Sequence, residues 1–215
     1  MPATIPNRSN QGLPRPLLSS SSARSTIMSR PGLNRTIVVE RAALILDDRS
    51  LDGLSLSVLA ESLGVRTPSL YKHIDGMPGL QRDIMLRAKT SLAHVLGQSA
   101  IGRSRDDAIR ALALAYRRWA LQHPGQYPMT VHAPASGDDD DACVSSSISD
   151  VVFNVLEGYG LLGDDAVDAT RFLRSSLHGF VDLETRGAFE LPVDLERSFA
   201  RLTESVVVAL DTWSR

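Results

Sequence analysis

The sequence predicts an all-α protein, and three observations support this fold class. Beyond residue 34, apolar residues recur at intervals of three and four, the spacing that places them along one side of a helix. Gly, Pro and Asp-Gly turn signals separate these periodic segments. No segment shows the clear alternation of apolar and polar residues that a half-buried strand requires.

The first 33 residues differ in composition from the rest of the chain. They are rich in Pro and Ser, lack acidic residues and show neither a helical nor a strand period. Their basic side chains are those of Arg8, Arg15, Arg24 and Arg30. Such a composition is typical of a disordered basic tail, and we expect one over residues 1–33.

Residues 34–80 are predicted to form a small domain that begins with two helices. The first helix starts near Arg35 and runs for about four turns with an apolar stripe on one side. The second helix is short. Ser55 or Ser57 is expected to cap its start, and Gly64 supplies the permissive backbone conformation where it ends.

A third, short helix follows a tight turn and is polar and cationic on one side. We expect Thr67 to be its N-cap, Pro68 to occupy its first position, and Leu70 and Ile74 to form its buried side. Two short helices joined in this way are typical of a helix-turn-helix motif, whose second helix enters the DNA major groove. The sequence therefore predicts a DNA-binding domain.

Residues 81–215 are predicted to form a second, entirely helical domain. A long amphipathic helix from about residue 78 to residue 97 joins it to the first domain. Further helices are expected at about 105–122, 141–159, 164–188 and 193–213.

Charge is distributed unevenly along the chain. Residues 1–97 carry 12 Lys and Arg against 7 Asp and Glu, whereas residues 98–215 carry 11 against 18. The two parts together give the formal net charge of −2. A basic front and an acidic back indicate that only the front of the chain faces a polyanion.

Three features are expected of a cytoplasmic protein. The single Cys143 excludes an internal disulfide, which fits a reducing compartment. No uninterrupted apolar run approaches the roughly 18 residues that a membrane span needs. No continuous apolar segment follows the arginines of the tail, so a secretory signal is not expected.

The stretch SLSVLAESLGVRTPSLYKHIDGMPGLQRDIM resembles the N-terminal DNA-binding region of TetR/AcrR-type transcriptional regulators. The resemblance extends over about residues 35–85 and includes the preceding helix, LAESLGV, the Tyr-x-His ending and Leu80. It implies an all-helical homodimer that binds a palindromic operator. It also implies a C-terminal domain that binds a small molecule, and release of the operator when that molecule binds.

The resemblance and the side-chain chemistry together assign roles to the helix-turn-helix residues. Tyr71 and His73 are expected to contact phosphate or sugar. Residues expected to approach base edges are Arg66, Thr67, Pro68, Ser69 and Lys72. For any one of these residues alone, the alternative is a solvated surface position. The basic tail is either idle or enters an adjacent minor groove.

The sequence departs from the family pattern at Met77, where these regulators commonly have a lysine that supports a phosphate contact. The departure puts that contact in doubt. Arg82, or the backbone amides at the start of the long helix, are the expected substitutes.

The second half is more loosely similar to the C-terminal domains of the same regulators. There the segment LRSSLHGFVDLETRGAF is like part of a dimerisation and ligand region. Candidate ligand-binding residues are Tyr116, Trp119, His123, Tyr127, Met129, Phe153, Phe172 and His178, with ordinary core positions as the alternative. Candidate dimer-interface residues are Leu173, Leu177, Val181, Phe199, Leu202, Val206 and Leu210.

Two further motifs suggest other chemistry. GYGLLG at 158–163 matches the G-x-G-x-x-G pattern of dinucleotide-binding enzymes, but Asp164 and Asp165 would repel a pyrophosphate there. The acids of 138–141, with His132 and Cys143, suggest a metal site, although a solvated loop and helix cap is the simpler interpretation. We expect no cofactor, no metal and no catalytic residues.

The sequence thus predicts a cytoplasmic, homodimeric transcriptional repressor that a small-molecule effector releases from its operator. Within binding proteins, the alternative is a regulator that needs no ligand or that activates transcription. In another class, the alternative is a nucleotide-dependent oxidoreductase.

Overall fold

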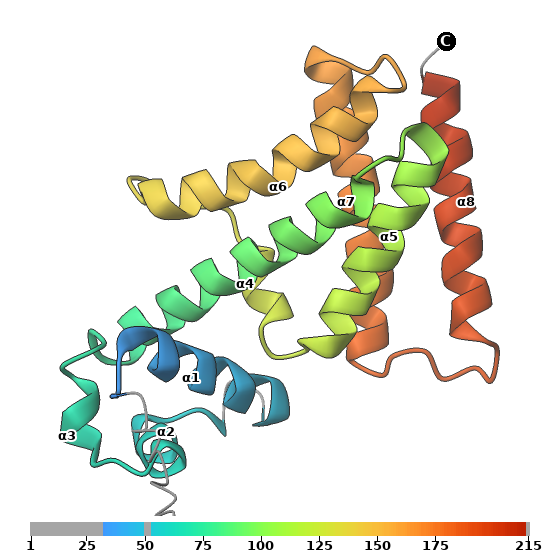
Figure 1. The fold of residues 1–215 in the computed structure, drawn as a ribbon. Helices are drawn as coiled ribbons and strands as arrows, with labels where there is room; N and C mark the ends of the chain where they lie inside the picture. The colour runs from blue at the N-terminus through green and yellow to red at the C-terminus, as the bar shows by residue number, and fades with distance from the viewer. Residues whose placement is uncertain (1–31, 50–52, 214–215) are drawn as a thin grey trace, which may run out of the picture. The chain divides into compact units, whose positions relative to one another are not determined.

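The computed structural model describes residues 32–49 and 53–213, and every regular element in these ranges is helical (Figure 1). The all-α prediction is therefore confirmed for the part of the chain described. No helix in it is long and apolar enough to cross a membrane. Of the predicted tail, residues 1–31 lie outside the described residues.

Eight α-helices and one short 3-10 helix follow one another in the described ranges. Their bounds are α1 Arg35–Arg49, α2 Leu56–Leu63, α3 Thr67–Leu70, α4 Gly76–Ala100, α5 Arg105–Gln122, η2 Tyr127–Thr130, α6 Asp139–Glu157, α7 Gly163–Thr185 and α8 Leu195–Trp213. The predicted helix at 105–122 matches α5 at both ends. The other long helices differ from their predicted bounds by at most three residues, and η2 was not predicted from the sequence.

The first three helices and the start of α4 enclose one apolar core. Its buried side chains include Val38, Ala42, Leu59, Leu70 and Ile84. The start of α1 is fixed to α4 by a bidentate ion pair, in which the Arg35 guanidinium donates to both carboxylate oxygens of Asp83 at 2.7 and 2.6 Å. This core holds α2 and α3 in a fixed relation to α4.

A second core lies among α4, α5, α6, α7 and α8. Ala88, Leu92 and Leu96 of α4 are buried in it, together with Trp119 and Tyr127. Helix α4 therefore contributes its first half to one core and its second half to the other. A single continuous helix therefore joins the two cores (Figure 1).

The end of α1 meets the end of α5 at a compact polar joint. The Asp47 carboxylate accepts hydrogen bonds from the backbone amides of Gly125 and Gln126 at 3.1 and 3.0 Å, and lies 2.9 Å from Nδ1 of His123. Only glycine fits at residue 125, because a Cβ atom there would lie 2.0 Å from the carbonyl oxygen of Leu46. The joint is thus a second contact between the two cores.

A buried ion pair joins α4 to α6. Lys89 and Asp141 are 1% and 2% exposed, and their Nζ and Oδ1 atoms lie 2.5 Å apart. The ammonium also donates to Oγ of Ser145 at 3.1 Å and to the carbonyl oxygen of His132 at 2.9 Å. These additional hydrogen bonds help to offset the cost of removing the two charges from water.

We predict that Lys89 and Asp141 stabilise the protein as a pair and not separately. Lys89→Met or Asp141→Asn alone leaves an uncompensated buried charge and is expected to lower the free energy of unfolding by about 3–5 kcal/mol. The double variant is expected to lose clearly less than the sum of the two. Denaturant unfolding of the four proteins measures these values.

Arg171→Met is the control for the loss of a cation, because Arg171 pairs with Asp168 on the exposed side of α7. Stability is expected to change little in this variant, since exposed ion pairs contribute little. Additive losses in the double variant would contradict the prediction.

Candidate functional site

The turn between α2 and α3 is set by local backbone preferences. The Oγ atom of Ser55 caps α2 by accepting a hydrogen bond from the amide of Val58 at 3.2 Å. Gly64 ends the helix at φ 67°, a left-handed conformation that glycine adopts without steric cost. Both features agree with the sequence prediction, in which Ser55 was one of two expected caps.

Helix α3 is shorter than the sequence suggested, and its cap is one residue earlier. Arg66 is the N-cap and makes no side-chain cap hydrogen bond, so Thr67 is the first helical residue and not the cap. The helix ends at Leu70, whose carbonyl accepts hydrogen bonds from the amides of His73 and Ile74. The bond to His73 closes a tight turn in place of a further helical turn.

The buried and exposed sides of this segment agree with the predicted helix-turn-helix. Leu70 and Ile74 are 0% and 4% exposed and anchor the segment from behind. Exposed residues of the candidate set are Arg66, Pro68, Tyr71 and Lys72, and half-buried ones are Thr67, Ser69 and His73.

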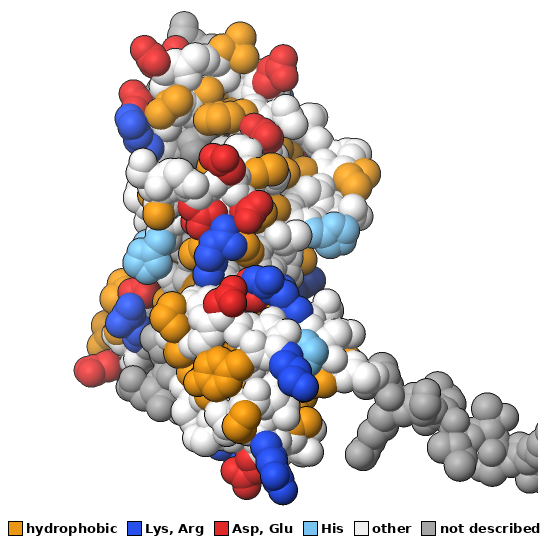
Figure 2. Space-filling view, turned by 90° about the vertical axis from the view of Figure 1, so that its left-hand side faces the viewer, with side chains coloured by type: hydrophobic (Ala, Val, Ile, Leu, Met, Phe, Trp, Pro, Cys, Tyr) orange, Lys and Arg blue, Asp and Glu red, His pale blue; other side chains and the backbone are white. Residues whose placement is uncertain are grey.

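None of the six polar side chains in this set has a hydrogen bond or ion pair to another described residue of the protein. Arg35 and Arg82 nearby are both paired with acids. The polar groups of residues 66–73, the α3 segment, are therefore available to an external partner. On the face shown in Figure 2, most Lys and Arg side chains lie in the middle and lower parts, and most of the acids lie in the upper part.

Arg82, one of the two expected substitutes for the phosphate contact, is paired with acids of its own chain. The guanidinium donates to both carboxylate oxygens of Asp138 and to Asp140, so its charge is already compensated. These hydrogen bonds hold the pKa of Asp138 below its usual range. Met77, where the family commonly has lysine, packs against the first core. The backbone amides at the start of α4 remain the predicted substitute.

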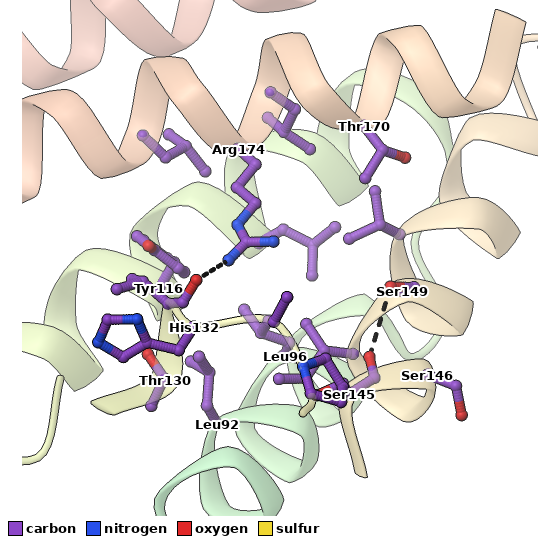
Figure 3. Close-up of a pocket in the computed structure, with 18 residues that line it drawn as sticks. Leu92, Leu96, Tyr116, Thr130, His132, Ser145, Ser146, Ser149, Thr170 and Arg174 are labelled. Carbon is purple, nitrogen blue, oxygen red and sulfur yellow. Dashed lines mark hydrogen bonds between the residues drawn. The ribbon is translucent and has the colours of Figure 1, made fainter. Parts of the chain in front are cut away.

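Helices α4 to α7 and residues 130–134 line a partly open cavity of about 290 Å³ (Figure 3). Its apolar wall comes from four helices and includes Leu92, Leu96, Leu112, Val152 and Leu173. Its polar lining residues are Tyr116, Thr130, His132, Ser145, Ser146, Ser149, Thr170 and Arg174. A mainly apolar cavity with a few convergent polar groups is typical of a small-molecule site.

Of the eight candidate ligand-binding residues, the structure places only Tyr116 on the wall of this cavity. Tyr127 and His178 lie behind it in a chain of contacts. The Tyr116 and Tyr127 hydroxyls are 3.0 Å apart, and the Tyr127 hydroxyl is 2.6 Å from Nδ1 of His178. Burial raises the pKa of both tyrosine hydroxyls, which therefore stay protonated at neutral pH.

The other five candidates do not line the cavity either. Trp119 is buried and donates from Nε1 to Ser91 of α4 at 3.1 Å. His123 belongs to the joint with α1, and Met129 packs on the first core. Phe172 stacks on Trp213 at the end of α8, and Phe153 is half-buried outside the cavity. These aromatic candidates thus pack elsewhere in the protein and do not line this cavity.

Sequence reasoning missed most of the polar residues that do line the cavity. Ser145 and Ser149 lie one turn apart on α6, and Thr170 and Arg174 lie one turn apart on α7. The sequence feature that could have identified them is a pair of polar residues four positions apart, next to the apolar stripe of each helix.

The structure also corrects the predicted dimer interface. Six of the seven candidates are buried at 5% exposure or less within their own chain, and Leu202 is half-buried against the same core. These side chains pack on α5 and on each other, so they are not available to a second copy. Helical periodicity marks a buried face but does not reveal what covers it.

Neither of the two other motifs forms the site it suggested. GYGLLG is the turn between α6 and α7, and no strand precedes it among the described residues. The acids at 138, 140 and 141 pair with Arg82 and Lys89. In the described ranges, no three His, Cys, Asp or Glu side chains are grouped to hold a metal ion.

Comparisons with known proteins agree with this arrangement. A family model for the C-terminal domain of tetracyclin repressor-like proteins matches residues 109–206. The chain is 34% identical over 186 residues to the uncharacterized helix-turn-helix-type regulator Rv0681 of Mycobacterium tuberculosis, covering 86% of this chain and 85% of that protein. It is 35% identical over 175 residues to the uncharacterized regulator YobS of Bacillus subtilis, covering 80% and 89%.

Among solved structures, apo ActR from Streptomyces coelicolor has the same fold. It aligns with a TM-score of 0.65 over 86% of this chain and 98% of its own, at 19% sequence identity. The two sequence relatives match 86% and 80% of this chain at 34% and 35% identity, which shows the family to which the chain belongs. The chain belongs to the TetR family of helix-turn-helix transcriptional regulators, which are DNA-binding proteins and not enzymes.

Proposed function

We propose that this regulator is a cytoplasmic, homodimeric repressor that leaves a palindromic operator when a small molecule fills the cavity of its C-terminal domain. The observation that carries the proposal is the position of the cavity against α4. Leu92 and Leu96 of α4 line it, and the same helix begins directly after the α3 segment.

The α3 segment is the proposed reading element. Its polar side chains have no partner among the described residues, and Leu70 and Ile74 hold it on the first core. We assign phosphate or sugar contacts to Tyr71 and His73. Contacts with base edges are assigned to Arg66, Thr67, Pro68, Ser69 and Lys72.

Lys89 is the proposed link between the cavity and α4. Its ammonium binds Ser145 and the carbonyl of His132, and both of these residues also line the cavity. A ligand that displaces either residue changes the hydrogen bonds that position α4. A ligand can shift the DNA-binding equilibrium only by its difference in affinity for the two arrangements.

Two further observations support small-molecule control and dimerisation. ActR, which shares the fold, has been solved in complex with (S)-DNPA. Apolar side chains on the outer surface of α7 and α8 include Leu183, Val208 and Trp213, which are 45%, 65% and 45% exposed. We assign the dimer interface to this outer surface. A regulator without a ligand, or an activator, is the alternative.

We predict that two substitutions in the α3 segment affect DNA binding differently. Tyr71→Phe is expected to weaken binding to all sequences by about 1.5–3 kcal/mol, because it removes a hydrogen bond to a charged acceptor. If Lys72 reads a guanine, Lys72→Ala relaxes one operator position by about 1–3 kcal/mol. If Lys72 meets only phosphate, the sequence preference stays and the salt slope falls by about one unit.

Fluorescence anisotropy with a genomically selected operator and a scrambled duplex, at several salt concentrations, measures both effects. Arg118→Ala removes an exposed cation from α5, outside the proposed dimer surface, and is the control. If Tyr71→Phe and Lys72→Ala bind both duplexes as the parent does, the α3 segment is not the reading element.

We also predict that blocking the cavity abolishes the response to an effector without impairing DNA binding. Val152→Trp places a large side chain on the cavity wall, whereas Asn154→Trp on the exposed side of α6 is the matched control. Compounds that raise the melting temperature of the parent protein and of Asn154→Trp, but not of Val152→Trp, are the cavity ligands.

Such compounds are expected to weaken operator binding of the parent by about 5- to 150-fold, the usual range of coupling between two sites. Val152→Trp is expected to bind the operator with or without them. Cavity ligands that leave the operator affinity of the parent unchanged would favour the alternative of a ligand-independent regulator.

A further inference from the structure

We infer that the effector is an amphipathic anion, a carboxylate on an apolar body, and that Arg174 binds its charge. This inference rests on the proposed function of the cavity and names the chemical class of its ligand. It rests on two observations: Arg174 lines the cavity, and no acidic residue does.

Arg174 is an exposed residue of α7 that lines the cavity, and Figure 3 shows its side chain between Tyr116 and Ser149. Its Nη2 atom donates one hydrogen bond, to the carbonyl oxygen of Val131 at 2.7 Å. No acidic side chain among the described residues pairs with it. Most of the five guanidinium donors are therefore available to a ligand.

The cavity holds no negative charge to balance this cation. None of its lining residues is Asp or Glu. Two acids outside the lining pair with other cations, because Asp141 pairs with Lys89 and Asp182 pairs with Arg186. A cationic ligand would meet only repulsion there, whereas a carboxylate would supply the missing charge.

The remaining lining fits an uncharged body attached to that carboxylate. Seven of the eighteen lining residues are leucine, isoleucine or valine side chains from α4, α5, α6 and α7. Charge pairing beside such a wall is stronger than in water because the surroundings are less polarisable. A planar guanidinium also matches a carboxylate through two parallel hydrogen bonds.

The test compares compounds that share one skeleton and differ in charge. Octanoate, octanamide and octylamine form one series, and 2-naphthoate, 2-naphthamide and 2-naphthylmethylamine form another. Isothermal titration calorimetry at neutral pH and fixed ionic strength measures their affinity for the full chain. At least one carboxylate is expected to bind about tenfold or more tightly than its amide, because its hydrogen bonds are charge-assisted.

Arg174→Gln is expected to remove this preference and to leave the amide affinity unchanged. Arg171→Gln removes the same charge from the same helix outside the cavity and is expected to keep the preference. Arg174→Lys retains the charge without the planar fork and is expected to keep part of it. If Arg174→Gln melts below the measuring temperature, the parent and Arg174→Lys still decide the result.

The inference is overturned if neither carboxylate binds the parent, if an amide or amine binds as tightly, or if Arg174→Gln keeps the preference. Operator anisotropy with each compound separates this outcome from failure of the proposed function. A neutral compound that releases the operator leaves effector control intact and refutes the anion. An Arg174-dependent carboxylate that leaves operator affinity unchanged supports the anion and refutes effector control.

Discussion

The buried pair of Lys89 and Asp141 is the interaction on which the position of α6 against α4 depends. Two opposite charges are stable in the interior only if they pair with each other and if hydrogen bonds satisfy their other polar atoms. Here the additional partners of the ammonium are Ser145 and the backbone of His132. The charge requirement therefore fixes α6, and the segment before it, against the middle of α4.

This requirement gives α4 its place in the proposed mechanism. The first half of the helix packs with α1, α2 and α3, whereas the second half lines the cavity. Lys89 lies between these two halves. The joint of Asp47 with residues 123–126 is a second contact, and Gly125 allows α1 to approach it closely. In the proposed mechanism, the Lys89–Asp141 pair and the Asp47 joint are the two polar contacts that change when α4 moves relative to the second core.

The sequence predicted the local structure well because the signals involved are local. Ser55 and Gly64 act within a few residues of their own positions, and the apolar stripes reflect the helical period. The length of α3 was less predictable, because its hydrogen bonds to Leu70 depend on how the following turn closes. The likeness to a known regulator family added the functional role of this segment.

The cavity was less predictable because it depends on contacts between distant helices. Tyr127 and Trp119 are large aromatic residues near a turn, yet the core covers both of them, and only Tyr116 reaches the wall. Arg174 and Ser145 come from different helices, and nothing in their sequence neighbourhoods marks a common site. The stripes of α7 and α8 were assigned to a dimer for the same reason, since periodicity does not distinguish a partner chain from the interior.

The most direct test of the account measures the coupling between cavity and operator in the double variant Lys89→Met with Asp141→Asn. Operator affinity is determined by anisotropy with and without a saturating cavity ligand, for the parent and for the double variant. If the buried pair transmits the effect, the double variant binds ligand and operator separately, but the ratio of the two operator affinities falls towards one. An unchanged ratio in a folded double variant would contradict the account.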